Sequence, residues 1–202
     1  LQAAHADVTR LVDAVAQKLV AAGKITNAYP ELNWTKRLLK ITQEFPDAPL
    51  MLIKAGVIMP AFQNLYQHPK LLDALEDLGL GGDIAAHTAW NLRAKMPSHP
   101  DTVVPWHQDN SYWEPRLWDE HIITGWIALV DATEDNGCMQ FIRKGHKSGR
   151  TANHTIGSST NTWYTEMSEE NMAQQVCSTL INHDAMYRCW RHCNSTANKN
   201  LK

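Results

Sequence analysis

The chain has 202 residues, of which 44% are hydrophobic, and 19 Lys and Arg residues against 21 Asp and Glu residues give a formal net charge of -2. This length and this hydrophobic content suit one compact domain with a substantial core. No window concentrates basic residues as nucleic acid or an anionic membrane requires, so we expect neither as a partner. A small-molecule ligand is the expected partner.

The sequence also indicates where the protein works. No apolar run is long enough to cross a bilayer, and no charged-then-apolar leader precedes a cleavage pattern. The four cysteines are too few and too irregularly spaced for a disulfide scaffold, which favours a reducing compartment. We therefore expect a cytoplasmic protein without a membrane span, and the oligomeric state stays open.

Periodic apolar residues predict helices in the first third of the chain. From His5 to Ala22, valines and leucines recur at spacings of three and four, and Gly23 stands where a helix would stop. A second helical pattern runs from Leu71 to Leu78 after the proline at position 69. Residues 1–82 are therefore predicted to be mostly helical.

After residue 83 the pattern changes to short runs separated by Pro, Asn, Asp and Gly, and such runs predict strands joined by turns. The runs are Ile84 to Lys95, Val103 to Tyr112, Ile122 to Asp131 and Cys138 to Ile142. The pair Asn136 and Gly137 predicts a tight turn, because glycine adopts a positive φ easily. Ser168 to Gln175 begins with Ser-Glu-Glu, which favours a helix start.

The stretch VVPWHQDNSYW, from Val103 to Trp113, places a histidine and an aspartate two residues apart. On an extended segment the side chains of His107 and Asp109 leave the same face, so both can reach one atom. Imidazole and carboxylate are the ligands of a divalent metal that activates oxygen, with other positions left open. By itself the pair is a weak signal, and a polar strand edge is the competing interpretation.

The neighbouring residues make the signal specific. WHQDNSYW is followed by ITGWIALVDATEDNGCMQFI and GHKSG, with WNLRAKMP upstream and looser matches in LIKAGVIMPAF and HPKLLDALEDLGL. Together these segments resemble the phytanoyl-CoA dioxygenase family of iron(II)- and 2-oxoglutarate-dependent oxygenases. The combination is far more specific than any one of its pieces.

This resemblance implies a mainly β fold with flanking helices, the double-stranded β-helix or cupin-like jelly roll. It implies one domain over residues 1–202, with a helical N-terminal part at 1–82 and a jelly-roll core at 83–176. A divergent tail at 177–202 then leaves the jelly roll incomplete or altered at its C-terminus.

The resemblance also assigns roles to single residues. His107 and Asp109 fall on the first two iron ligands of the family and would be catalytic. The positions that bind 2-oxoglutarate in the family fall on Gln108, Trp126, Asn91, Lys54 and Lys95. Each has a competing interpretation, because a tryptophan on an apolar run can belong to the core and a lysine can simply be solvated.

The third iron ligand of the family has no clear match. When the LIN segments are aligned, the family's histidine position is occupied by Tyr187. Three alternatives stay open, namely His192, His183, or no third protein ligand. His192 is favoured because its distance from Asp109 along the chain is close to the family's spacing.

The arginine that grips the distal carboxylate of 2-oxoglutarate also lacks a clear match. Arg188 or Arg191 could supply this guanidinium. A rival interpretation is a zinc site in the tail, although its residues fit no common zinc spacing. Those residues are His183, Cys189, His192 and Cys193.

The function implied by the resemblance is a dioxygenase that hydroxylates an aliphatic C–H bond of a small molecule, with iron(II) as cofactor and O2 and 2-oxoglutarate as co-substrates. The alternative is an inactive jelly-roll relative that binds a small molecule or a protein partner without turnover. The two hypotheses differ in whether the tail supplies the third iron ligand and the arginine that binds 2-oxoglutarate. Nothing in the sequence selects a substrate.

Overall fold

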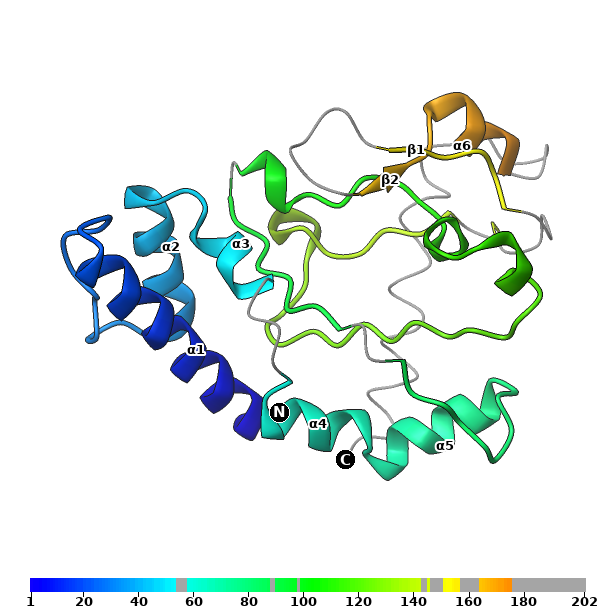
Figure 1. Ribbon diagram of the computed structural model, residues 1–202, viewed down its shortest axis with the longest axis horizontal. Coiled ribbons are helices and arrows are strands. Elements are labelled where there is room, and N and C mark those ends of the chain that lie inside the picture. The colour runs from blue at the N-terminus through cyan, green and yellow to red at the C-terminus, as the bar shows by residue number, and fades with distance from the viewer. Residues whose placement is uncertain are drawn as a thin grey trace. The chain divides into compact units, whose positions relative to one another are not determined.

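The computed structural model describes residues 1–53, 58–87, 90–97, 99–142, 145, 151–156 and 164–175. These residues form six α-helices, four short 3-10 helices and one two-stranded sheet (Figure 1). The chain divides into two compact units. The first contains Leu1–Thr102 and His121–Asp131, and the second contains Val103–Glu120 and the described residues from Ala132 onward.

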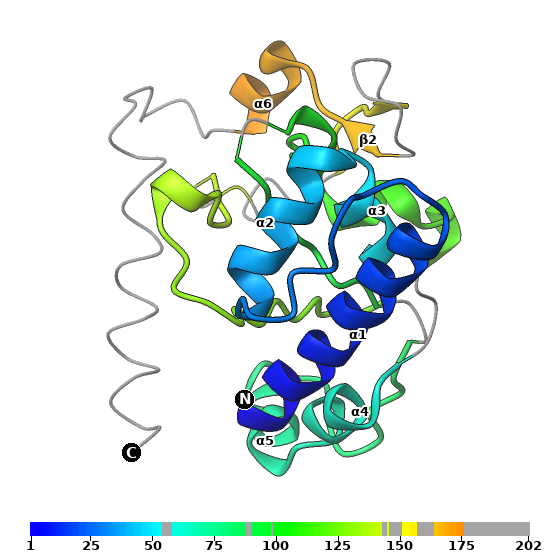
Figure 2. The same cartoon turned by 90° about the vertical axis from the view of Figure 1, so that its left-hand side faces the viewer.

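Five α-helices belong to the first unit. They are α1 (Gln2–Ala21), α2 (Trp34–Glu44), α3 (Ala48–Ile53), α4 (Pro60–Tyr66) and α5 (Pro69–Asp77). Helix α1 packs against α2, α3 and α4. Figures 1 and 2 show α2 and α3 beside the C-terminal half of α1 and α4 near its N-terminus. Helix α1 is therefore the element around which this unit is organised.

Helix α1 forms where the apolar spacing predicts it. Its apolar face is buried at Val8, Val12, Val15, Ala16 and Leu19. The helix stops because Gly23 takes a φ of 63°, which lets the Lys24 N–H donate to the Leu19 carbonyl at 2.9 Å. The helix predicted from His5 to Ala22 is confirmed.

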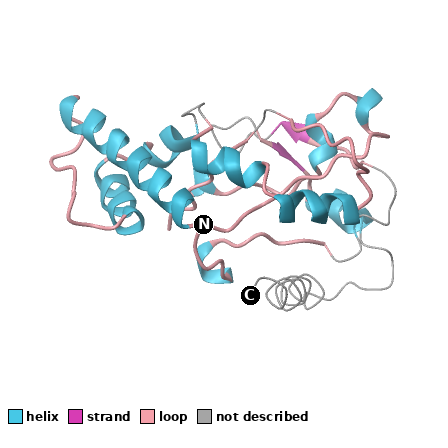
Figure 3. Cartoon of the chain, turned by 90° about the horizontal axis from the view of Figure 1, so that it is seen from below, coloured by secondary structure: helices cyan, strands magenta, loops and turns pink. Residues whose placement is uncertain are grey.

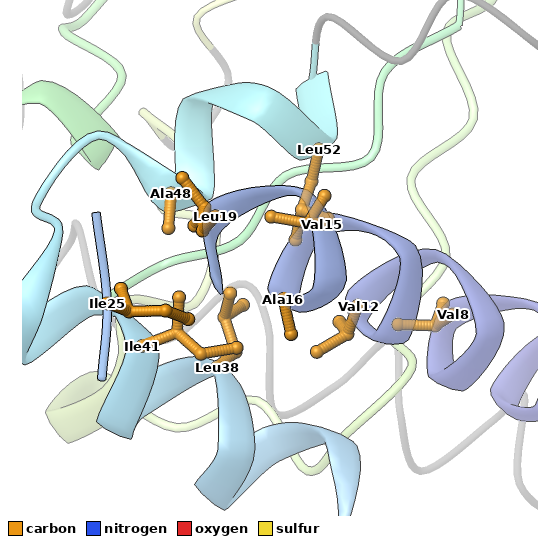
Figure 4. Packing of buried hydrophobic residues seen from close by; sticks show 10 residues of the cluster. All are labelled: Val8, Val12, Val15, Ala16, Leu19, Ile25, Leu38, Ile41, Ala48 and Leu52. Carbon is orange, nitrogen blue, oxygen red and sulfur yellow. The ribbon is translucent and has the colours of Figure 1, made fainter. Parts of the chain in front are cut away.

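The core of the first unit lies on this apolar face of α1, as Figure 4 shows. Leu38 and Ile41 come from α2, Ala48 and Leu52 from α3, and Ile25 from the loop before α2. Ile41 and Leu52 are among the largest fully buried side chains. Truncating such a side chain to alanine typically costs about 2–5 kcal/mol, so these side chains dominate the packing of the three helices.

A buried cation joins α2 to α1. Arg37 is 5% exposed, and it donates from Nε to the Ala28 carbonyl at 2.6 Å and from Nη2 to Asp13 Oδ1 at 2.8 Å. Because arginine stays charged in proteins, its burial is tolerated only with such partners. The start of α2 is capped by the Asn33 side chain, which accepts a hydrogen bond from the Lys36 N–H at 3.0 Å.

Helix α4 receives its N-terminal cap from α1. Its own N-cap residue, Met59, supplies no side-chain hydrogen bond, and Pro60 has no N–H. The Ala61 N–H instead donates to Oδ2 of Asp7 at 2.9 Å, and the other oxygen of Asp7 pairs with Arg10. Asp7 is 1% exposed, and each of its two oxygens has a hydrogen-bond partner, as a buried carboxylate requires.

Helix α5 confirms the helix predicted from Leu71 to Leu78. Pro69 occupies its first turn, and the His68 side chain accepts a hydrogen bond from the Lys70 N–H at 3.2 Å. Gly79 follows the helix with a φ of 93°, a conformation that a residue with a side chain rarely adopts.

The second unit contains the sheet and the last described helix. Strands β1 (Thr155–Ile156) and β2 (Thr165–Glu166) pair antiparallel, with Thr155 opposite Glu166 (Figure 1). Helix α6 (Glu169–Gln175) follows, and the Ser168 hydroxyl accepts a hydrogen bond from the Asn171 N–H at 3.2 Å. The helix predicted at Ser168 to Gln175 is confirmed. None of the described helices combines the length and the hydropathy of a membrane span.

The structure assigns no strand to the described residues of the four runs that were predicted as strands. Figure 3 shows long loops connecting the helices and a single pair of short strands. A strand needs a hydrogen-bonded neighbour, and the alternation of side chains along a run does not say which segment pairs with it. The double-stranded β-helix therefore stays a prediction.

Four 3-10 helices interrupt these loops. They are η1 (Pro100–Thr102), η2 (Asp109–Tyr112), η3 (Pro115–Leu117) and η4 (Glu134–Asn136). The predicted Asn136 and Gly137 turn is confirmed, because Gly137 has a φ of 80° and the Cys138 N–H donates to the Thr133 carbonyl at 3.0 Å. The Asn136 side chain also accepts a hydrogen bond from the Thr133 N–H at 2.7 Å.

Replacement of Asp7 by alanine should destabilise the protein. The variant leaves the buried Ala61 N–H without its acceptor, and an unsatisfied buried group costs about 1–3 kcal/mol. Urea unfolding should show this loss for Asp7→Ala and a smaller loss for Asp7→Asn, which keeps an acceptor oxygen. Asp73→Ala, an exposed change of the same charge in α5, is the control, and equal midpoints for Asp7→Ala and Asp73→Ala would contradict the capping role.

Glu44 should make the stability depend on pH. Its carboxylate accepts hydrogen bonds from the Tyr29 hydroxyl and from the Thr26 N–H, and these bonds to the charged form lower the pKa of Glu44. Its stabilising effect is therefore complete above the ordinary pKa of 4.5 and is lost as the pH falls through the lowered pKa.

The measurement is the urea midpoint of the wild type and of Glu44→Gln between pH 7 and pH 3. We expect the wild type to be more stable at pH 7 and the difference to shrink toward pH 3. Glu76→Gln removes an exposed carboxylate from α5 and controls for net charge. A difference that stays constant over this range would contradict the assignment to Glu44.

Candidate metal centre

The candidate metal centre lies in the second unit, where an extended residue meets a 3-10 helix. Gln108 is extended, with φ -108° and ψ 136°, and η2 begins at Asp109. The Ser111 N–H donates to the Gln108 carbonyl at 2.9 Å and closes this turn. The strand predicted here is replaced by this turn, yet Gln108 is extended and the side chains of His107 and Asp109 on either side of it converge.

His107 has a defined tautomer. Its Nδ1 lies 2.8 Å from the Pro105 carbonyl oxygen, and because a carbonyl can only accept, Nδ1 carries the proton of this bond. In the neutral ring, Nε2 then carries the lone pair that a metal would use. A backbone carbonyl at the other ring nitrogen is the usual way in which proteins orient a ligating histidine.

Nε2 of His107 faces Oδ1 of Asp109 at 3.2 Å. Two acceptor atoms this close repel one another unless a proton or a cation lies near both. Metals take nitrogen and oxygen ligands at about 2.1 Å, so two ligands at a right angle lie about 3 Å apart. The donor types and their separation therefore fit a divalent metal of the iron(II) kind.

The pair is open to solvent on one side. The side chain of His107 is 24% exposed and that of Asp109 is 47% exposed. The Tyr112 ring meets the His107 ring edge-on, with centroids 5.4 Å apart and an interplanar angle of 78°. One side of the histidine is thus packed, and the aspartate side gives access to small molecules.

A second histidine, His154, forms a hydrogen bond with Gln108, the residue between His107 and Asp109. Its Nε2 accepts a hydrogen bond from the Gln108 N–H at 2.9 Å, and its Nδ1 donates to the Ala152 carbonyl at 2.8 Å. The Gln108 side-chain oxygen accepts a third bond from the Ala152 N–H at 2.6 Å. Segments 107–109 and 152–154 are therefore joined by hydrogen bonds between a backbone group of one segment and a side chain of the other.

The neutral form of His154 is favoured. Burial lowers the pKa of His154, the hydrogen bond to Ala152 opposes this shift, and the positive charge that His107 carries when it is protonated lowers the pKa further. A neutral imidazole has one donor and one acceptor, which are the two roles that His154 has in these hydrogen bonds.

Strand β2 contacts the same turn through hydroxyl groups. Ser111 Oγ donates to the Gln108 carbonyl at 2.7 Å and lies 2.6 Å from Thr165 Oγ1. Because a serine hydroxyl has one hydrogen, the Thr165 hydroxyl is the donor to Ser111. The Met167 N–H also donates to the Trp106 carbonyl at 2.7 Å. Residues just before β1 and just after β2 thus both form hydrogen bonds with the segment from Trp106 to Ser111.

The predicted site residues that the structure describes are divided between the two units. His107, Gln108 and Asp109 lie together in the second unit, whereas Trp126, Asn91 and Lys95 belong to the first unit. Trp126 is 39% exposed, so it is not a core residue. The other predicted residues, Lys54 and His192, lie outside the described residues, as do His183, Arg188 and Arg191.

Within the described part of the chain, no three His, Cys, Asp or Glu side chains gather as metal ligands. The candidate centre therefore consists of the His107 and Asp109 pair, and the predicted third ligand stays a prediction.

The contribution of His154 was not visible in the sequence. It stands in TANHT, which matches no metal or catalytic pattern, and its partner Gln108 is 46 residues earlier in the chain. Sequence reasoning about local spacing cannot detect a contact of this kind.

A histidine of fixed tautomer facing a carboxylate defines a candidate non-haem metal site. The family model for phytanoyl-CoA dioxygenase (PhyH) matches residues 8–180 of the chain. The chain belongs to the phytanoyl-CoA dioxygenase family, and the predicted membership is confirmed. Members of this family are generally iron(II)- and 2-oxoglutarate-dependent oxygenases.

Two curated relatives bear the name phytanoyl-CoA dioxygenase domain-containing protein 1. The protein of Rattus norvegicus is 33% identical over 92 residues, which is 45% of this chain and 30% of the relative. The protein of Mus musculus is 32% identical over the same shares. The aligned part of the chain thus spans less than a third of these relatives. No solved structure matches the chain.

Replacement of Asp109 by asparagine should weaken metal binding. The variant keeps the shape of the side chain but loses the negative charge beside His107 Nε2. We expect the affinity for Co(II), a spectroscopic substitute for iron(II), to fall at least about 10- to 100-fold in a titration of the visible bands. Asp119→Asn, the same change at an exposed position of the same unit, should bind Co(II) like the wild type. Equal affinities of the two variants would remove Asp109 from the site.

Proposed function

We propose that this chain is an iron(II)- and 2-oxoglutarate-dependent dioxygenase that hydroxylates an aliphatic C–H bond of a small molecule. The observation that carries the proposal is the 3.2 Å approach of His107 Nε2 to Asp109 Oδ1 in a chain of this family. When bound, iron(II) supplies the redox chemistry by which O2 and 2-oxoglutarate become an alcohol oxygen, succinate and CO2.

His107 and Asp109 would hold the metal, and each contributes something different. The Pro105 carbonyl keeps the proton of His107 on Nδ1, so Nε2 can bind without first losing a proton. Asp109 supplies negative charge that offsets part of the charge of a divalent ion. The exposed side of Asp109 leaves space for the co-substrate and for the substrate.

Gln108, Trp126, Asn91, Lys54 and Lys95 are proposed to contact 2-oxoglutarate. Ala152 donates to the side-chain oxygen of Gln108, so any contact of Gln108 with a carboxylate would come from its NH2 group, which is a donor. The indole of Trp126 is exposed, so it is accessible to a ligand. A lysine ammonium, from Lys54 or Lys95, would pair with a carboxylate of the co-substrate.

The proposed third metal ligand is His192, with His183 as the second choice. An arginine of the same tail, Arg188 or Arg191, would bind the distal carboxylate of 2-oxoglutarate.

An anaerobic titration with iron(II) and 2-oxoglutarate tests the proposed function. We expect a visible charge-transfer band, which needs both bound together, and succinate formation once O2 is admitted. His107→Ala should lose the band, and His121→Ala, an exposed histidine of the first unit, should keep it. His192→Ala and His183→Ala then identify the third ligand by which of them abolishes the band.

Two results would contradict the proposal in different ways. A wild type without band and without succinate is not a 2-oxoglutarate oxygenase. A wild type that shows the band and forms no succinate binds the co-substrate without turnover, which is the alternative of an inactive relative.

A further inference from the structure

We propose that His154 is a positioning residue of the metal centre, which keeps His107 and Asp109 convergent by holding the backbone of Gln108. This inference rests on the proposed metal site and adds to it a residue that is not itself a ligand. The hydrogen bond from the Gln108 N–H to His154 Nε2, at 2.9 Å, carries the inference.

A hydrogen bond to the Gln108 N–H can restrain the directions of the His107 and Asp109 side chains together. Gln108 stands between His107 and Asp109, and its extended φ and ψ favour an arrangement in which the two flanking side chains share one face. A change in the φ of Gln108 would change the direction of the His107 side chain relative to that of Asp109, and it would also move this N–H. The bond to His154 opposes this change.

The hydrogen bonds between the two segments support each other. His154 Nδ1 donates to the Ala152 carbonyl, so the ring is held in the orientation and the tautomer that present Nε2 to Gln108. Gln108 in return accepts the Ala152 N–H through its side-chain oxygen at 2.6 Å. Strand β1 begins only at Thr155, so these bonds hold the 152–154 segment where no strand pairing does.

A ligand role for His154 conflicts with this arrangement. Both ring nitrogens bind backbone groups, and Nε2 would have to give up the Gln108 N–H in order to reach a metal. Because one lone pair on Nε2 cannot serve the Gln108 N–H and a metal at the same time, the two roles exclude each other. If His154 is a positioning residue, its replacement should weaken metal binding and leave the metal's coordination unchanged. If it is a ligand, its replacement should change the coordination.

The test compares His154→Phe with His154→Gln in the full chain. Phenylalanine keeps the size of the ring and removes both hydrogen bonds. Glutamine keeps an acceptor oxygen near the place of Nε2. The control Asn153→Ala changes an exposed neighbour, whose backbone carbonyl still accepts from Asn171 at 2.9 Å.

The first readout is the dissociation constant for Co(II), from its visible absorption. We expect His154→Phe to bind Co(II) about 10- to 100-fold more weakly than the wild type, the range for residues that orient metal ligands. His154→Gln should recover most of this loss, and Asn153→Ala should match the wild type. At saturation the bands of all four proteins should have the same positions.

The second readout is the thermal midpoint of each metal-free protein, which separates a positioning role from a general loss of stability. A His154→Phe variant that unfolds earlier but binds Co(II) with wild-type affinity while folded would overturn the inference. A shift of the saturated bands in His154→Gln would overturn it in favour of a ligand role. A wild type that binds no Co(II) would instead refute the proposed metal site itself.

Discussion

The approach of two electron-pair donors is the interaction on which the functional part of this structure depends. His107 Nε2 and Asp109 Oδ1 lie 3.2 Å apart, and neither atom can satisfy the other without a proton or a cation. The surrounding groups hold them in this position. Pro105 sets the tautomer of the histidine, Tyr112 packs against its ring, and the turn at Gln108 places both side chains on one face.

Both units contain the same kind of hydrogen bond. In each, a side chain far away in the sequence accepts a hydrogen bond from a backbone N–H that has no partner within a helix or strand. Asp7 accepts the Ala61 N–H at the start of α4, 54 residues further along the chain. His154 accepts the Gln108 N–H across 46 residues. In both places the bond fixes the local direction of the backbone. The first orients a helix against the core, and the second orients two candidate metal donors.

The agreement between sequence and structure follows the range of the interactions. The helices at Gln2–Ala21, Pro69–Asp77 and Glu169–Gln175 were predictable because apolar spacing, prolines and capping residues act within a few residues. The turn at Gly137 was predictable for the same reason. The strands predicted between Ile84 and Ile142 are not assigned in the described residues, because an alternating pattern specifies a buried face without a pairing partner.

The sequence by itself determined the family, and it pointed to His107 and Asp109 as candidate metal ligands because the residues around them form one dense motif. Only the tertiary structure decided how this pair is held. It showed a 3-10 helix where a strand was expected, a histidine tautomer set by a carbonyl, and the hydrogen bonds of His154 and Asp7. The physical reason is that a hydrogen bond between residues tens of positions apart leaves no local pattern in the chain, whereas an amphipathic helix and a short motif such as His-x-Asp do.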